Sequence, residues 1–230
     1  MPANFIARRW FLLPLLLALL GLAGCGRQVT VNAYLDPARA QGLFPGARFA
    51  VLPQADQRSD PLLEREVADK IGLVLTSSMY RLDTTQTAEY LLTYAFDAEM
   101  SQGAEMRAVH EPGRKVKVTT ERDGKKVTKE VEEPGYTRYE PRLVTRHFYR
   151  LRLAAYLNQA QGQPRRDLAV WSAEVSTADT QEGFYSQGNL RDALNYLIVG
   201  GLSVLGQAGP EPVSFLVKDD DPRLKLIRRR

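Results

Sequence analysis

The chain has 230 residues, a formal net charge of +4 and a single cysteine. One cysteine allows no disulfide within the chain, so an ordinary hydrophobic core must hold the fold together. The near-balance of 31 basic and 27 acidic side chains argues against nucleic acid as the main partner.

The first residues have the order of properties that a secretory leader has. Arg8 and Arg9 are followed by an apolar run from Trp10 to Ala23, which is shorter than the ~20 apolar residues that a membrane-spanning helix needs. The run leads into Leu22-Ala23-Gly24-Cys25, a match to the lipobox of bacterial lipoproteins. We therefore predict a signal peptide over 1–24, cleavage between Gly24 and Cys25, and lipid on the Cys25 sulfur.

The alternative is that Cys25 is an incidental cysteine at the end of a membrane helix. Acylation is favoured because a lone exposed thiol outside the cytoplasm is a liability. Stable anchoring needs more than one acyl chain, such as palmitate, and a triacylated N-terminus supplies them. Gly26 stands where an aspartate would resemble the inner-membrane retention signal, so we expect the inner leaflet of the outer membrane, facing the periplasm.

Cleavage would leave 206 of the 230 residues, and without Arg8 and Arg9 the 31 basic residues become 29 against 27 acidic ones. This length suits one domain. We expect residues 25–46 to form a lipidated tether that runs into a first edge strand, with a short alternating piece at Val29-Thr30-Val31, and residues 47–206 to form the domain. Its first strand is predicted over 48–53 (RFAVLP), a short apolar run closed by proline.

A helix over roughly 60–79 is the clearest local prediction. Asp60 suits the N-cap and Pro61 the first helical position. Its apolar residues recur at helical spacing on one face and are Leu63, Val67, Ile71, Val74 and Leu75. This face predicts a helix that packs on the core and carries no catalytic group.

Residues 88–99 predict an interior strand, because both of its faces are apolar. Residues 101–145 are rich in glycine, proline and charge. Within them, two polar alternating runs flank Asp123-Gly124, a strong signal for a β-hairpin. Because so few apolar groups accompany it, we expect this hairpin, 114–132, to be an insertion that projects from the domain.

Further strands are predicted over 146–158 and 167–177. A second helix is predicted from its N-cap Asn189 to Gly206, where Gly200-Gly201 permits close approach to a sheet. Residues 207–230 contain three prolines and many charges and predict a flexible tail. The predicted fold is α+β, a two-layer sandwich of a mainly antiparallel sheet with two helices on one face.

No arrangement of residues in the sequence predicts catalysis. His110 and His147 lack metal-ligand spacing, and we expect each at the surface or at a strand end. No serine lies in a nucleophile elbow, and the carboxylate pairs fall where solvated charge is the default. The sequence therefore predicts a protein that is not an enzyme, with no metal site and no cofactor.

A segment of the insertion has a composition that suits protein contacts. It combines aromatic and basic side chains between prolines, namely Tyr136, Arg138, Tyr139 and Arg142. The alternative is that the two tyrosines fold back onto their own domain. The basic side chains of the hairpin could also contact an anionic membrane surface or an acidic partner, although acidic residues dilute their charge.

The chain resembles the DUF4136 family of bacterial envelope lipoproteins in four short stretches. These are RFAVLP, the helix start at Asp60–Leu63, TAEYLLTYAF at 87–96 and DLAVWSAEV at 167–175. The resemblance covers roughly 47–205, and the insertion and the charged tail depart from it. It implies an envelope lipoprotein and transfers no catalytic residue, because the family has no established reaction.

We expect a membrane-anchored, non-enzymatic interaction or envelope-maintenance module, with the bilayer and an envelope protein as partners. The alternatives are a carrier or chaperone for an apolar or lipid ligand, held between helices and sheet, and an envelope hydrolase.

Overall fold

The computed structural model describes residues 25–39, 43–54, 60–122, 125–159, 163–181 and 187–229. The fold is mixed α+β with a mainly antiparallel sheet, as the sequence predicts. The chain divides into two compact units. We call them the body (the described residues up to Glu99, Phe148–Asp179, and those from Gln187 onward) and the ribbon (Met100–His147 with residues 180 and 181).

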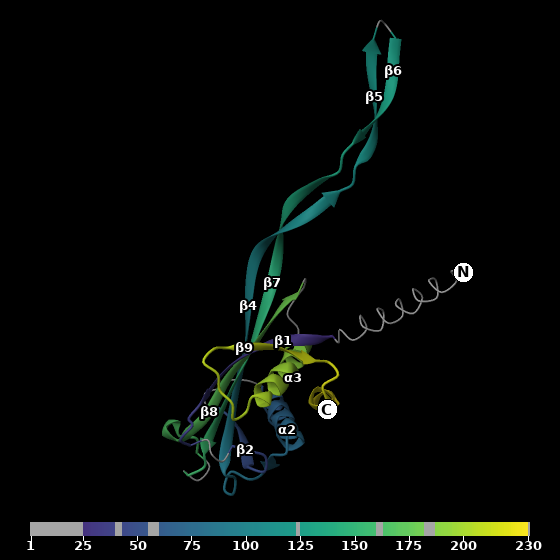
Figure 1. Cartoon of the computed structure of the whole chain (residues 1–230). Coiled ribbons are helices and arrows are strands. Elements are labelled where there is room, and N and C mark those ends of the chain that lie inside the picture. Colours follow the sequence, from purple (N-terminus) through teal and green to yellow (C-terminus); the bar gives the residue numbers. More distant parts are fainter. Residues whose placement is uncertain are drawn as a thin grey trace, which may run out of the picture. The chain divides into compact units, whose positions relative to one another are not determined.

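A seven-stranded sheet with the order β3-β2-β4-β7-β8-β1-β9 forms the centre of the body (Figure 1). Its strands are β1 (Gly26–Leu35), β2 (Arg48–Pro53), β3 (Arg81–Leu82), β4 (Tyr90–Glu111), β7 (Tyr136–Leu157), β8 (Ala169–Gln181) and β9 (Val213–Lys218). Strand β2 runs parallel to β3 and β4, whereas β1 is antiparallel to both β8 and β9. The chains of β4 and β7 continue from the body into the ribbon.

The helices are α2 (Pro61–Ser77), α3 (Gln187–Ser203) and α4 (Pro222–Arg228), and a 3₁₀ turn spans Arg166–Leu168. Helix α2 begins as predicted, since the Asp60 carboxylate accepts a hydrogen bond of 2.9 Å from the Leu62 amide. Helix α3 begins at Gln187, two residues before the predicted N-cap Asn189.

Two adjacent glycines let α3 lie directly against the sheet. A Cβ on Gly200 would come within 2.8 Å of Val29, and one on Gly201 within 2.8 Å of both Leu153 and Val175. These three sheet residues belong to β1, β7 and β8 and are fully buried. The predicted role of Gly200-Gly201 is therefore confirmed, and the core fills the space beneath this helix.

The prediction of a tether running into an edge strand is wrong for residues 26–35, because all of them belong to β1, which lies between β8 and β9 and not at an edge. Val29, Val31 and Ala33 alternate with polar residues and are buried, with 0%, 3% and 8% of their surfaces exposed. A strand needs only one apolar face when the other face is open, so the polar composition that suggested a tether is compatible with a strand.

The predicted flexible tail is also wrong for the described residues 207–229, which include β9 and α4. The Asp221 carboxylate accepts a hydrogen bond of 2.8 Å from the Arg223 amide and so caps α4. Leu224 and Ile227, three residues apart, are fully buried in the core. One apolar pair at helical spacing thus suffices to dock a charged segment.

Within the ribbon, β5 (Arg114–Arg122) pairs antiparallel with β6 (Lys125–Glu133). Val116 faces Val131, whereas Val118 faces Lys129. The turn residues Asp123-Gly124 lie outside the described residues. Strands β4 and β7 reach Glu111 and Tyr136, so extended chain occupies much of 101–145 on both sides of this pair.

Candidate functional site

The site with the strongest sequence signal begins at Cys25. Its thiol is exposed, and its carbonyl accepts a hydrogen bond of 2.9 Å from the Asp219 amide. Strand β1 begins at the next residue, Gly26. The residue predicted to carry lipid is therefore attached to the sheet without an intervening linker, while Gly24 lies outside the described residues.

Strand β9 packs closely against the residue that follows Cys25. Gly26 pairs with Lys218, and Gln28 pairs with Leu216. A Cβ on Gly26 would lie 2.5 Å from the Val217 carbonyl oxygen and 3.2 Å from Leu216 Cγ, and the first separation is shorter than van der Waals contact allows. Glycine is thus the residue that lets β9 lie against the start of β1.

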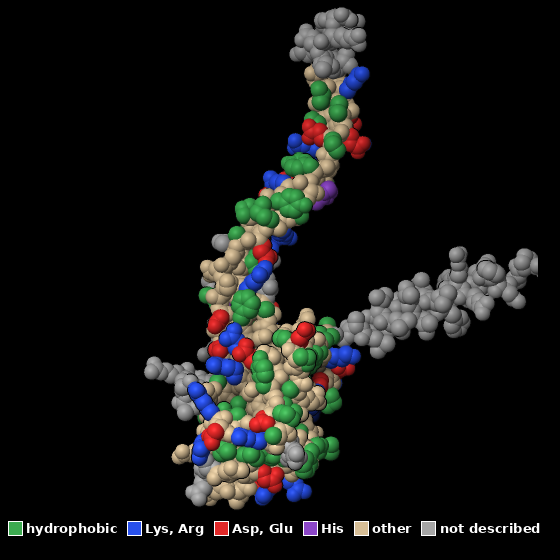
Figure 2. All heavy atoms as spheres, turned by 60° about the vertical axis from the view of Figure 1, so that its left-hand side comes forward, with side chains coloured by type: hydrophobic (Ala, Val, Ile, Leu, Met, Phe, Trp, Pro, Cys, Tyr) green, Lys and Arg blue, Asp and Glu red, His purple; other side chains and the backbone are tan. Residues whose placement is uncertain are grey.

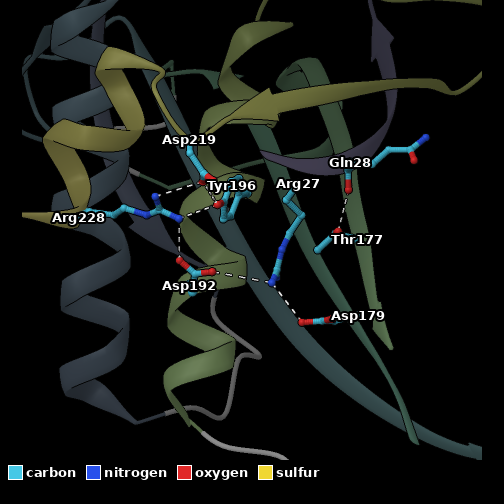
Figure 3. A network of polar contacts seen from close by, with 8 residues as sticks. All are labelled: Arg27, Gln28, Thr177, Asp179, Asp192, Tyr196, Asp219 and Arg228. Carbon is cyan, nitrogen blue, oxygen red and sulfur yellow. Dashed lines mark hydrogen bonds and ion pairs between the residues drawn. The ribbon is translucent and has the colours of Figure 1, made fainter. Parts of the chain in front are cut away.

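Arg27 connects this strand to β8 and α3, as Figure 3 shows. Its Nη2 atom lies 3.2 Å from Asp179 Oδ2 and 3.8 Å from Asp192 Oδ2. Nearby, the Thr177 hydroxyl donates a hydrogen bond of 2.7 Å to the Gln28 carbonyl. Side chains from β8 and α3 therefore secure both residues that follow Gly26.

Tyr196 of α3 is the centre of the polar network in Figure 3 and is only 5% exposed. Its hydroxyl donates to Asp219 and accepts a hydrogen bond of 2.6 Å from Arg228. The guanidinium carbons of Arg27 and Arg228 lie 5.3 and 5.0 Å from the ring centroid, within the range of cation–π attraction. Burial, and after it the bond to Asp219, raises the pKa of the Tyr196 phenol.

Arg228 completes the network from α4. It lies 3.1 Å from Asp192 and 3.3 Å from Asp219. Each carboxylate in the network thus faces a guanidinium, and the phenol keeps its proton because its pKa is raised. Groups held in this way suit a structural role, because no free base or nucleophile is left to act on a substrate.

We call this network the anchor clamp: Arg27, Asp179, Asp192, Tyr196, Asp219 and Arg228. Its members come from β1, β8, α3, the segment after β9, and α4. It joins the chain next to Cys25 to the last described helix. Because Arg27 and Asp179, for example, lie 152 residues apart, no local sequence pattern could have predicted it.

A groove of about 560 Å³ with both apolar and polar lining groups, Phe148 and Tyr149 among the apolar ones, lies on the sheet face opposite the core. Gln28 and Thr30 line it and alternate with the buried Val29 and Val31, which identifies the face. Its other polar lining residues are Asp97, Glu99, Arg150, Glu174, Ser176 and Thr177. We call it the open-face groove.

A second cavity of about 300 Å³ lies beside the open-face groove and shares Glu174 with it. Arg150 pairs with Glu174 at 3.4 Å, and Arg152 pairs with Asp97 at 3.5 Å. Charged groups of both signs on one accessible face can recognise a polar partner surface.

The four side chains predicted for partner contact all lie on β7 within the ribbon. Tyr136 and Tyr139 are 57% and 66% exposed. A hydrogen bond to Glu111 raises the pKa of Tyr136. Arg138 is 3.2 Å from that same Glu111, so the structure brings Tyr136 and Arg138 together around one carboxylate, while Arg142 is half-buried.

The ribbon also contains a close approach that sequence reasoning missed. A Cβ on Gly113 would lie 2.6 Å from the Glu133 carbonyl oxygen, and one on Gly135 would lie 2.7 Å from the Glu111 carbonyl oxygen. The repeated Glu-Pro-Gly at 111–113 and 133–135 is the sequence pattern that could have predicted this close approach. Figure 2 shows hydrophobic side chains among charged ones on the ribbon surface, and Met100 and Met106 are 58% and 63% exposed.

The two histidines differ in environment. His110 is exposed, and its Nδ1 atom lies 3.3 Å from the Thr137 hydroxyl. His147 is 1% exposed, so its predicted place at the surface or a strand end is wrong. It alternates with exposed neighbours in β7 and faces the side on which Tyr149 is buried. Among the residues that the structure describes, no group of three potential ligands could hold a metal ion.

No family model matches this chain, and no curated protein matches it. Among solved structures, a PelC dodecamer from Paraburkholderia phytofirmans is similar at 17% identity with a TM-score of 0.41, over 79% of this chain and 99% of that one. A leucine-to-methionine variant of that dodecamer gives 17% identity and a TM-score of 0.40, over 78% and 98%. A PDZ domain protein from Parabacteroides distasonis gives 12% identity and a TM-score of 0.41, over 87% of this chain and 41% of that chain. Similarity at this level assigns no function.

Within the described part of the chain, each helix is too short or too polar to cross a membrane.

Proposed function

We propose that this protein is a lipid-anchored, non-enzymatic interaction module of the bacterial cell envelope. Acyl chains on Cys25 hold it at the inner leaflet of the outer membrane, facing the periplasm. The supporting observation is the sequence Leu22-Ala23-Gly24-Cys25 together with the place of Cys25 in the fold. Its carbonyl is hydrogen-bonded to Asp219, and the sheet starts at the next residue.

The anchor clamp gives this attachment mechanical support. It links Arg27, two residues from Cys25, to the buried Tyr196 and through it to Arg228. Partly buried charged contacts of this kind depend on all their partners being present, because each charge left alone is costly to bury. A role in fixing the anchored end explains why so many paired charges gather beside Cys25.

An interaction module also needs accessible surface that can recognise a partner. The open-face groove supplies polar and charged side chains, and the ribbon supplies the exposed Tyr136 and Tyr139. Exposed tyrosines beside arginine are common at binding hot spots. We propose that an envelope protein binds the ribbon through Tyr136, Arg138, Tyr139 and Arg142.

The packing of the body favours this role over a carrier for an apolar ligand. The carrier hypothesis places the ligand between helices and sheet. There, Gly200 and Gly201 already meet the side chains of β1, β7 and β8, and the core residues beneath α3 are buried. The grooves on the open face carry charged side chains among their apolar ones, including Arg150 and Glu174.

The resemblance to the DUF4136 envelope lipoproteins is part of the proposal. Its four stretches fall on β2, the start of α2, the start of β4, and the 3₁₀ turn with the first half of β8. All four stretches therefore belong to the body. Most of the ribbon lies in the insertion, which departs from the resemblance.

Metabolic labelling with a palmitate analogue tests the anchor. The wild-type protein should incorporate the label and fractionate with the outer membrane, and Cys25→Ala should do neither. Ser176→Ala, a small change in the open-face groove, is the control and should behave as wild type. Equal labelling of wild type and Cys25→Ala would contradict the proposal.

In vivo photo-crosslinking tests the partner surface. A photoreactive residue at position 139 should yield a defined crosslinked envelope protein. The same residue at Leu62, which is 74% exposed on α2, is the control and should not. Equal crosslinking of the same protein from both positions would contradict a specific contact at the ribbon.

A further inference from the structure

Two leucines at opposite edges of the sheet are exposed to the same extent. Leu216 on β9 is 50% exposed, and Leu82 on β3 is 51% exposed. The strand order places β9 at one edge of the body sheet and β3 at the other. Leu216 lies on β9, and the residue after that strand, Asp219, is hydrogen-bonded to Cys25. Leu82 lies at the other edge, against Gly72 of α2.

The outward side of β9, which is the side that faces away from the core, carries Leu216 and Lys218. Leu216 pairs with Gln28 and Lys218 pairs with Gly26, so both side chains lie on the sheet face opposite the core, beside the start of β1. Val217 between them is 4% exposed and points into the core. This edge therefore presents one apolar side chain and one ammonium group next to the lipid attachment point.

Distance decides whether this edge can reach a bilayer. Gln28 is three residues from Cys25 along an extended strand, which is about 10 Å at 3.4 Å per residue. The polar interface of a bilayer adds roughly 5–8 Å on each side of its hydrocarbon core. Since 10 Å exceeds this depth, Leu216 lies within the interface when β1, which has no linker between it and Cys25, runs along the membrane surface.

The charges near this edge suit a phospholipid surface. Asp219 is paired with Arg228, and Asp221 is paired with Arg223 at 2.8 Å, so two of the three neighbouring carboxylates are offset. Lys218 is exposed, and a lysine at a membrane interface extends its ammonium group to lipid phosphates while its stem stays in the apolar region.

We propose that the outward side of β9 is a bilayer-contacting surface, with Leu216 in the interfacial region and Lys218 at the headgroups. The proposal rests on the proposed function, since it requires lipid on Cys25. It commits the body to one orientation, with β9 towards the membrane and the β3 edge away from it.

The test uses the full lipoprotein in vesicles of phosphatidylethanolamine and phosphatidylglycerol. Lipidation consumes the only native thiol, so a cysteine introduced as Leu216→Cys or Leu82→Cys can be labelled uniquely with an environment-sensitive fluorophore. The probe at 216 should shift to shorter wavelength and be quenched by nitroxide-labelled lipids. The probe at 82, matched in exposure, should show neither effect.

A second pair of variants tests the lysine. Quenching at position 216 should increase with the share of phosphatidylglycerol. Lys218→Glu should abolish that dependence, and Arg81→Glu, an equal charge change on an exposed residue of β3, should leave it intact. Loss of the dependence in both variants would show a general charge effect and overturn the role of Lys218.

Mass spectrometry of the N-terminal peptide and vesicle flotation keep the two proposals apart. An acylated Cys25 with flotation and equal quenching at 216 and 82 would overturn the orientation alone. An unmodified Cys25 would overturn the proposed function, and this surface with it.

Discussion

The body and the ribbon use the same two strands in opposite ways. In the body, Leu92 of β4 and Leu151 of β7 are fully buried. In the ribbon, Met106 of β4 and Tyr139 of β7 are 63% and 66% exposed. Strand pairing alone therefore leaves side chains either buried or exposed. The helices that cover the sheet determine which side chains are buried and contribute to stability. Those of the ribbon remain available for contact.

Loss of the largest core side chain should give the largest effect on the body. Trp171 is 1% exposed, and its indole nitrogen donates a hydrogen bond of 3.0 Å to the Gln207 carbonyl. Trp171→Ala should lower the free energy of unfolding by about 3–5 kcal/mol, measured by urea denaturation with circular dichroism. Trp171→Phe, the control, should cost clearly less. An equal loss in both would show that the cavity does not determine the cost.

Gly26→Ala tests the close packing at the anchored end. Its Cβ would meet the Val217 carbonyl oxygen at 2.5 Å, so β9 must shift and the free energy of unfolding should fall by about 1–3 kcal/mol. Gly103→Ala is the control in the ribbon, where no atom lies within 4 Å of the new Cβ, and it should not destabilise. Similar thermal unfolding midpoints for the two variants would contradict the close packing of β9 against Gly26.

The cap of α4 should have a smaller and pH-dependent effect. Hydrogen bonding to Arg223 lowers the pKa of Asp221, so its contribution to stability is present above the unfolded pKa of about 3.9. That contribution is lost as the pH falls through the lower folded value. Asp221→Ala should cost about 1 kcal/mol at neutral pH and less in acid, measured by thermal unfolding over a pH series. Asp220→Ala, at an exposed position, should change little, and an equal cost for the two would contradict the cap.

The smallest effect on stability should come from the ribbon. Tyr139→Ser removes an exposed side chain, so the melting temperature should not change measurably. Crosslinking from a neighbouring ribbon position should nevertheless be lost if Tyr139 contacts the partner. A drop in melting temperature comparable to that of Gly26→Ala would show that exposed ribbon side chains stabilise the fold as the buried body side chains do, and would contradict the comparison.

Local signals made part of this molecule predictable. Asp60 and Pro61 located the start of α2, and the apolar stripe of α3 and its paired glycines located its packing face. The length of β1 and its place inside the sheet were missed because only one of its faces is apolar. Helix α4 was missed because Leu224 and Ile227 lie among charges. Composition averaged over a segment hides a single buried face.

The candidate site was predictable only at Cys25, where a short motif carries the chemistry. The anchor clamp around Tyr196 was not predictable, because Arg27 and Arg228 approach the same ring from the two ends of the described chain. In the sequence, each of these two arginines has the properties of an ordinary charged surface residue. Only the fold brings them together.

Hydrogen exchange of the lipidated protein tests most directly whether Cys25 is attached to a rigid sheet. We predict that the amides of residues 27–31, which pair with β9 and from Thr30 onward also with β8, are protected to the same degree as those of β8 at 171–175. Exchange of residues 27–31 as fast as that of the ribbon amides at 114–122 would contradict it, because the anchor would then be a tether.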